Sequence, residues 1–126
     1  MSADSPAFDF FAFRVAMESQ DVSAWTGFYA EDAEWLEYKH SYPLKSPRRM
    51  SGRAEIQAFL ARVATSGVDL RVSDEVVGSD RAAFCLWCRL PDDRRIIEHI
   101  IIHFRDGRIT RQVDVESWDP ESPDLA

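Results

Sequence analysis

Apolar residues recur at helical spacing in three segments of the first half of the chain, which predicts three helices. Ser5-Pro6 supplies an N-cap and a proline at the first position of the first helix. Asp21 is the expected N-cap of a short second helix, and Ser51-Gly52 begins a third helix that Gly67 ends. The apolar positions are Phe8, Phe11, Ala12 and Val15 in the first helix, Trp25, Phe28 and Tyr29 in the second, and Ile56, Phe59, Leu60 and Val63 in the third.

The second half of the chain alternates between apolar and polar residues, which is typical of strands. Strands are expected over 68–72, 81–90, 94–104 and 108–118, separated by turn signals at 78–80, 91–93 and Asp106-Gly107. An earlier strand is expected over 33–38, followed by a loop over 40–50. Residues from 119 on are expected to form a loose tail.

Helices followed by hairpin-linked strands indicate an α+β fold. We expect a curved, mixed or antiparallel sheet wrapped around the N-terminal helices, with a hollow left open at one end. The 126 residues suffice for one domain, so a single domain is expected over 1–126.

Composition narrows the range of partners. The net charge of −7 argues against a nucleic acid and against an anionic membrane surface. No apolar stretch is long enough to span a membrane. Cys85 and Cys88 form a C-x-x-C within an expected strand, where residues three apart point to opposite faces. Two free thiols are therefore expected, which is typical of a cytoplasmic location.

Three segments together resemble the NTF2-like superfamily, and in particular its SnoaL-like domains. They are the run Tyr29-Ala30-Glu31-Asp32-Ala33-Glu34-Trp35, the helix start at 52–60, and Phe104-Arg105-Asp106-Gly107-Arg108-Ile109. The resemblance implies a cone-shaped pocket for a small molecule and no cofactor. The superfamily includes polyketide cyclases, ketosteroid isomerase, a dehydratase and an epoxide hydrolase, as well as non-catalytic domains.

Asp114 is the first candidate catalytic residue. It lies where SnoaL-type cyclases, by resemblance, carry an aspartate general acid/base. The histidine of that motif is replaced by Gln112, which can orient a partner but cannot transfer a proton, and the tryptophan is replaced by Val113. On an alternating strand Gln112, Asp114 and Glu116 share one face, opposite Ile109. The alternative is a solvated or dimer-facing polar surface.

Glu98 shares a predicted strand face with Ile100, Ile102 and Phe104. Apolar surroundings would raise the pKa of its carboxyl, as general acid/base chemistry near neutral pH requires. The alternative is an ion pair with Arg94 or Arg89.

Glu37 lies, by the same resemblance, where ketosteroid isomerase has its general base. Phe13 and Ile100 stand where that enzyme has its two oxyanion donors, so steroid isomerisation by that mechanism is not expected. His40, just beyond Glu37, is a candidate partner in a proton shuttle. The alternative for Glu37 is a surface pair with Lys39 or Arg49.

No metal site is expected from the histidines. On one strand, His99 and His103 are ~13 Å apart, which one ion cannot bridge. Both histidines lie with Ile101 on the outer face of the sheet, where we expect a homodimer interface.

The aromatic residues favour a small apolar or aromatic ligand. The expected ligand contacts are Phe13, Trp25, Tyr29, Trp35, Ile100, Ile102 and Gln112. Two functions remain open: proton-transfer catalysis without a cofactor, in a cyclisation, isomerisation, dehydration or epoxide opening, and a non-catalytic binding or dimerisation module.

Overall fold

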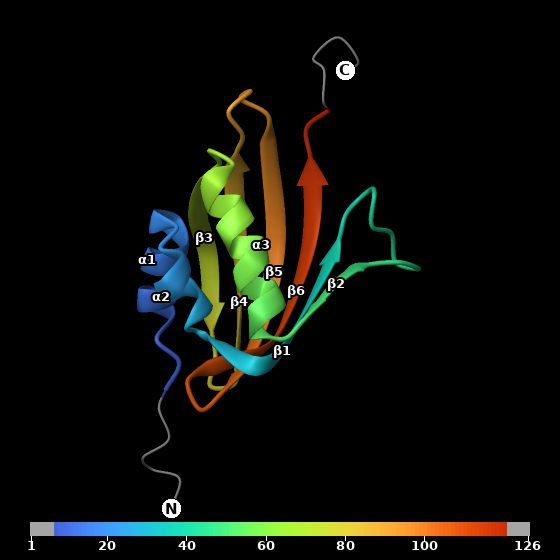
Figure 1. The fold of residues 1–126 in the computed structure, drawn as a ribbon. Coiled ribbons are helices and arrows are strands. Elements are labelled where there is room, and N and C mark those ends of the chain that lie inside the picture. Colours follow the sequence, from blue (N-terminus) through green and yellow to red (C-terminus); the bar gives the residue numbers. More distant parts are fainter. Residues whose placement is uncertain (1–6, 121–126) are drawn as a thin grey trace, which may run out of the picture.

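The computed structural model describes residues 7–120, which form three helices and one six-stranded sheet (Figure 1). The helices are α1 (Phe10–Ser19), α2 (Val22–Thr26) and α3 (Arg53–Thr65). The strands are β1 (Tyr29–Tyr38), β2 (Arg48–Ser51), β3 (Asp69–Val77), β4 (Arg81–Arg89), β5 (Arg95–Arg105) and β6 (Arg108–Trp118). The predicted α+β class is confirmed. No helix in this part of the chain has the length and apolar character that a membrane crossing requires.

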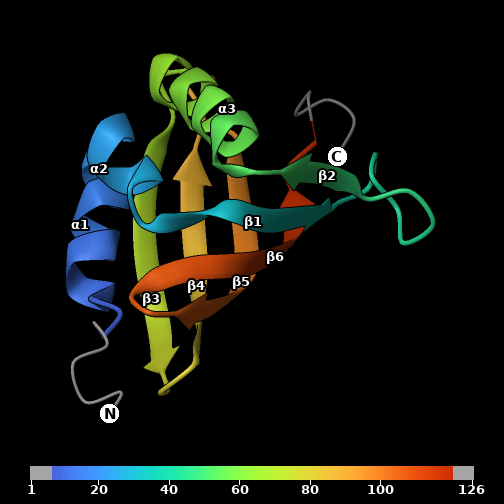
Figure 2. The ribbon, with the colours of Figure 1, turned by 60° about the horizontal axis from the view of Figure 1, so that its bottom comes forward.

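The strands are ordered β2-β1-β6-β5-β4-β3, and the sheet curves around the helices (Figure 2). Strands β3 to β6 form the expected antiparallel meander, whereas β1 runs parallel to β6. Strand β2 was not predicted, because its residues belong to the arginine-containing stretch that we expected to be a loop. They pair with β1, where Glu37 lies opposite Arg48 and Trp35 opposite Met50.

The helix starts follow the predicted caps with one exception. Helix α2 ends at Thr26, so Phe28 and Tyr29, which we expected in this helix, lie beyond it, and Tyr29 begins β1. Asp21 caps α2 by accepting a hydrogen bond from the backbone of Ala24, and Gly67 follows α3 with a φ of 80°. Helix α1 begins at Phe10 and is capped by Asp9, not by Ser5-Pro6. Ser5-Pro6 lies outside the described residues, and residues 7–9 are not helical. The Asp9 side chain can bond to the free N–H of Ala12, which an N-cap requires.

A bulge in β6 decides which of its side chains face the helices. The register between β5 and β6 shifts between His103 and Phe104, which pair with Arg111 and Ile109. Both Ile109 and Gln112 are therefore buried, although strict alternation had placed them on opposite faces. Beyond the bulge the predicted alternation holds, and Gln112, Asp114 and Glu116 all face inward.

The core lies between the concave face of the sheet and the three helices. Its fully buried side chains include Phe13 from α1, Ile56 and Leu60 from α3, and Ile102 and Ile109 from the sheet. The predicted loose tail is ordered at its start, because the backbone N–H of Asp119 donates to the carbonyl of Arg95. The rest of that tail, 121–126, lies outside the described residues.

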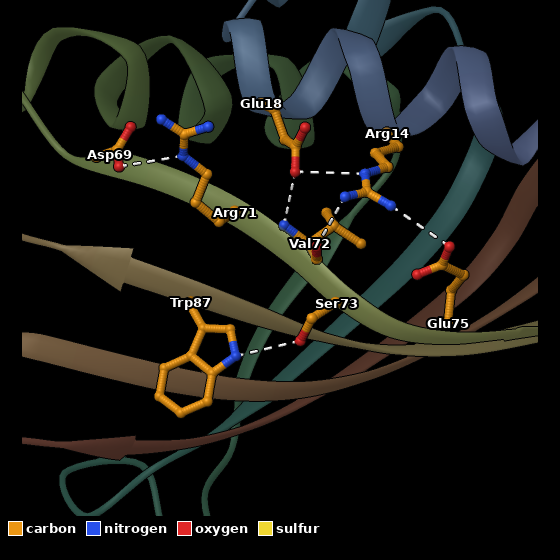
Figure 3. A network of polar contacts seen from close by, with 8 residues as sticks. All are labelled: Arg14, Glu18, Asp69, Arg71, Val72, Ser73, Glu75 and Trp87. Atoms are coloured by element: carbon orange, nitrogen blue, oxygen red, sulfur yellow. Dashed lines mark hydrogen bonds and ion pairs between the residues drawn. The ribbon is translucent and has the colours of Figure 1, made fainter.

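Helix α1 is fixed to strand β3 through the backbone of Val72 and the side chain of Glu75 (Figure 3). The Glu18 carboxylate accepts the backbone N–H of Val72 at 2.8 Å, and the Arg14 guanidinium donates to the Val72 carbonyl at 3.1 Å. Arg14 also forms ion pairs with Glu18 and Glu75. These contacts hold α1 and its inward-facing Phe13 against the end of the sheet.

Candidate active site

Two adjoining chambers lie between α3 and the concave face of the sheet. The inner chamber, of about 50 Å³, is enclosed by side chains that include Trp25, Tyr29 and Asp114. The outer chamber, of about 290 Å³, lies towards the C-terminal ends of β1 and β6 and the N-terminal end of β5, and its lining includes Arg62 and Glu116. Five residues line both chambers: Glu37, Phe59, Val63, Leu70 and Glu98. The inner chamber holds little more than a water or a small functional group, whereas the outer one approaches the usual size of a ligand site.

Asp114 lies at the wall of the inner chamber with no solvent exposure. The indole N–H of Trp35 donates to its Oδ2 at 3.0 Å, and the amide of Gln112 donates to its Oδ1 at 3.0 Å. Burial raises the pKa of Asp114 to about 7, and the charge of Glu37 adds to the rise, against the lowering effect of these hydrogen bonds. A carboxyl with this pKa exchanges its proton readily near neutral pH.

A chain of hydrogen bonds fixes the orientation of Asp114. The Tyr29 hydroxyl donates to Oε1 of Gln112, which leaves the Gln112 amide to donate to Asp114. The rings of Tyr29 and Trp35 are stacked at 5.8 Å, so both hydrogen-bond donors are held by packing. Gln112 thus has the orienting geometry that its position suggested.

Glu37 is buried and forms an ion pair with Arg48 of the neighbouring strand, at 3.6 Å between Nη1 and Oε1. The alternative interpretation, a surface ion pair of Glu37 with Lys39 or Arg49, is wrong. Arg49 pairs with Glu34, and the Lys39 ammonium lies over the rings of Tyr42 and Trp118. The Arg48 guanidinium also lies 4.5 Å from the centroid of the Phe59 ring. Strand β2 therefore supplies the cation that neutralises this buried carboxylate.

Glu98 and Glu116 face the same interior from β5 and β6. The Cys88 thiol donates to Oε2 of Glu98 at 3.3 Å, while Arg94 and Arg89, the alternative partners of Glu98, pair with Asp92 and Asp93. Burial raises the pKa of Glu98 well above its usual value, and the charges of Asp114 and Glu116 add to the rise. These contacts agree with the expectation that Glu98 lies in apolar surroundings that raise its pKa.

Glu116 accepts a hydrogen bond from the Trp118 indole at 2.8 Å through Oε1. Burial and the neighbouring Glu37 raise the pKa of Glu116 to about 9. The Oε2 atom of Glu116 and the Oε1 atom of Glu37 are both buried, and neither accepts a hydrogen bond from residues 7–120. Carboxylate oxygens of Glu37, Asp114 and Glu116 lie within 4.8 Å of one another. A proton on Glu116 supplies the donor that the pair with Glu37 otherwise lacks.

The structure brings most of the predicted residues to the chambers. Glu37 and Glu98 line both of them, and the others in the inner chamber are Phe13, Trp25, Tyr29, Trp35, Ile100, Gln112 and Asp114. Ile102 is a correction, since it is fully buried in the core and lines neither chamber.

His40 is a second correction. Strand β1 ends at Tyr38, and His40 is exposed in the following turn, outside both chambers. The expected Glu37–His40 pair is not formed, because Glu37 faces inward to Arg48. Position 40 is three residues from position 37, an odd step that reverses the direction of a side chain along a strand.

Several lining residues were not among the predicted site residues. Glu116 follows Asp114 by two positions on the same strand face, a signal that was available in the sequence. Phe59 and Arg62 lie on α3, and Trp118 ends β6. Their place in the outer chamber depends on how α3 crosses the sheet, which local sequence does not specify.

The fold has many relatives among solved structures. A candidate ketosteroid isomerase from Kribbella flavida is 20% identical over 90% of this chain and 78% of its own, with a TM-score of 0.73. An NTF2-like protein of unknown function from Mesorhizobium loti is 19% identical over 86% and 87%, with a TM-score of 0.75. A candidate polyketide cyclase from Sinorhizobium meliloti is 18% identical over 82% and 89%, with a TM-score of 0.64. At these identities the likeness shows a shared fold.

Comparison by sequence gives the family. No curated protein matches the chain. A family model described as the SnoaL-like domain matches residues 9–112, from the N-cap of α1 to the glutamine that orients Asp114. Because that match covers most of the chain and the fold agrees with it, the chain belongs to the family of SnoaL-like domains.

Proposed function

We propose that this domain binds a small, mostly apolar molecule in the two chambers and transfers protons to or from it by general acid/base catalysis. The reaction class is one that needs no more than proton transfer: an isomerisation, a cyclisation, a dehydration or an epoxide opening. The observation that carries the proposal is the convergence of four carboxyls, Glu37, Glu98, Asp114 and Glu116, on one buried interior.

The four carboxyls are suited to different tasks because their environments differ. Asp114, with a pKa of about 7, is the proposed general base, since it is ionised often enough to accept a proton and acidic enough to return it. Glu116 has a pKa of about 9 and is protonated at neutral pH. Burial also raises the pKa of Glu98, which favours its neutral form. Neutral carboxyls donate hydrogen bonds, so they would stabilise negative charge developing on a substrate oxygen.

Glu37 is the second candidate base, and it forms an ion pair with Arg48. It lies between the chambers, so a substrate in the outer chamber would meet Glu37 before Asp114. The inner chamber accepts only the reacting end of a molecule, so the ligand body is expected in the outer chamber.

The test is exchange of α-protons of a bicyclic ketone, 2-tetralone, in deuterated buffer, followed by proton NMR. The wild-type chain is expected to accelerate exchange above the buffer rate, and Asp114→Asn to reduce that acceleration about a hundredfold. Asp69→Asn, at an exposed position on β3, is the matched control.

The outcomes separate the two functions. Undiminished exchange in Asp114→Asn would remove Asp114 from its role. Binding of 2-tetralone without any exchange by the wild type would instead favour the non-catalytic binding module.

We further propose that the domain is a cytoplasmic homodimer joined through the outer face of the sheet. That face carries the exposed side chains of Ile101 and Val115 and, beside them, His99. A shallow hollow lies over the same residues, which favours close packing of a second sheet. Ile101→Asp should convert a dimer into a monomer in analytical ultracentrifugation. A wild-type monomer at high concentration would contradict the interface.

A further inference from the structure

The outer chamber has basic residues among its lining. Lys39 at the end of β1, Arg48 on β2 and Arg62 on α3 all line it. Arg48 is engaged with Glu37, but no carboxylate among residues 7–120 lies within ion-pair distance of Lys39 or Arg62. Both instead lie over rings that also line the chamber. The Lys39 ammonium is 4.1 Å from the Trp118 centroid, and the Arg62 guanidinium is 5.8 Å from that of Phe59.

The acidic side of the chamber opposes these cations only weakly. Glu116, with a pKa of about 9, is largely uncharged at neutral pH, the pKa of Glu98 is also raised by burial, and the Glu37 carboxylate is paired with Arg48. Two positive charges therefore remain in the lining of a chamber that belongs to a chain of net charge −7. A ligand with a negative group would be attracted to them, and a cationic ligand would be repelled.

The remaining lining fixes the shape and polarity of the ligand body. Apolar side chains of Phe59, Val63, Leu70, Leu90 and Ile96 surround the chamber. Its volume of about 290 Å³ is roughly twice that of an apolar cavity that holds benzene. A body of two fused rings is therefore the expected size.

We propose that the outer chamber binds a small aromatic or alicyclic carboxylate, with its anionic group against Arg62 and Lys39 and its ring body on the apolar wall. The inference rests on the proposed function, because it names the class of molecule on which that site acts. The orientation would place the carbon skeleton between these two basic residues and the inner chamber, so the far end of the ligand would face Glu37 and Asp114.

The experiment compares three probes that share a naphthalene body: 2-naphthoate, 2-naphthamide and the 2-naphthylmethylammonium ion. Isothermal titration calorimetry at pH 7 should show 2-naphthoate binding about tenfold more tightly than 2-naphthamide, and the ammonium ion more weakly than both. Equal affinity for naphthoate and naphthamide, or tighter binding of the ammonium ion, would overturn the proposal without any substitution having been made.

Two variants then locate the anion. Arg62→Gln and Lys39→Gln should each weaken naphthoate about tenfold and leave naphthamide unchanged. Arg71→Gln is the matched control, since it changes net charge equally at an exposed residue of β3 that lines neither chamber. If the chamber-lining variants behaved like Arg71→Gln, the anion would not bind there and the proposal would fail.

The experiments distinguish a failure of the proposed catalysis from a failure of the proposed carboxylate binding. Asp114→Asn is expected to keep its preference for naphthoate even where proton exchange is lost. A chain that binds naphthoate through Arg62 and Lys39 but exchanges no protons would retain this inference and refute catalysis.

Discussion

The indole N–H of Trp35 on β1 donates to Oδ2 of Asp114 on β6 across 3.0 Å, and both side chains are buried. This contact depends on the parallel pairing of β1 with β6, in which Trp35 lies opposite Gln112 and Glu37 opposite Asp114. One strand pairing thus brings together the proposed general base Asp114, one of its hydrogen-bond donors and the neighbouring carboxylate of Glu37.

Removing that donor should raise the pKa of Asp114 above about 7, because the hydrogen bond stabilises the charged carboxylate. Trp35→Phe keeps an aromatic ring but loses the N–H, and should cost about 1–3 kcal/mol of unfolding free energy. Carboxyl carbon NMR during a pH titration measures the pKa, and urea denaturation the stability. Trp87→Phe, whose indole donates to Ser73 on the surface, is the control, and a pKa equally displaced there would contradict the account.

Stability should fall as pH rises from about 4.5 to about 9, because the folded chain keeps a proton on Glu116 that the unfolded chain releases. The sign follows from the raised pKa: the native state binds more protons in this window, so higher pH favours unfolding. Glu116→Gln is neutral throughout, and its amide can donate to Glu37. It should stabilise the fold at pH 8 by roughly 1–3 kcal/mol and flatten the pH dependence.

The matched control for Glu116 is Glu34→Gln, which removes an exposed carboxylate paired with Arg49. Exposed pairs contribute about 0–1 kcal/mol, so the pH dependence of this variant should follow the wild type. Thermal denaturation at a series of pH values provides the comparison. Loss of stability at pH 8 in Glu116→Gln would show that the charged form is the native one.

Arg48→Met should destabilise the fold by about 1–3 kcal/mol, because it leaves the Glu37 carboxylate buried without a cation. Combining it with Glu37→Gln should recover most of that loss. A double-mutant cycle by urea denaturation measures the coupling. Arg49→Met, which disrupts only an exposed pair, should change stability little. Additive effects of Arg48→Met and Glu37→Gln would contradict the pairing.

The two cysteines should react differently with a thiol reagent in the native state. Cys85 is partly exposed on the outer face, whereas Cys88 is 4% exposed and burial raises the pKa of its thiol far above the usual value. Iodoacetamide at pH 8 should therefore label Cys85 and spare Cys88, as peptide mass spectrometry would show. Equal labelling of both, or a disulfide between them, would contradict the strand geometry.

The sequence predicted the elements of this fold better than their pairing. Local signals such as Asp21 as an N-cap and the Asp106-Gly107 hairpin are visible over a few residues, and the latter takes positive φ at both positions, as its turn type requires. The parallel contact of β1 with β6 and the recruitment of Arg48 into β2 are long-range. No local pattern determines them.

The candidate site shows the same division. Strand parity correctly grouped Gln112 with Asp114 and Glu98 with Ile100, because the period of two is a backbone property, whereas the inward direction of these faces was implied only by the family resemblance. It could not distinguish Ile102, which packs in the core, from Ile100, which lines the inner chamber. It also could not assign Arg48 to Glu37, since that pair exists only once β2 joins the sheet.

The contacts of α1 with the Val72 backbone also affect how two copies of this chain can associate. Strand β3 is the last of the sheet, and its outward peptide groups would otherwise offer a template on which a foreign strand could add. Arg14 and Glu18 form hydrogen bonds with the backbone carbonyl and N–H of Val72, in the middle of this edge strand. Further along β3, the irregularity near Asp74, where φ is 57°, interrupts the regular strand edge. Addition of a foreign strand is thereby hindered at the middle of this edge, which agrees with the proposal that two copies meet through the convex face of the sheet instead.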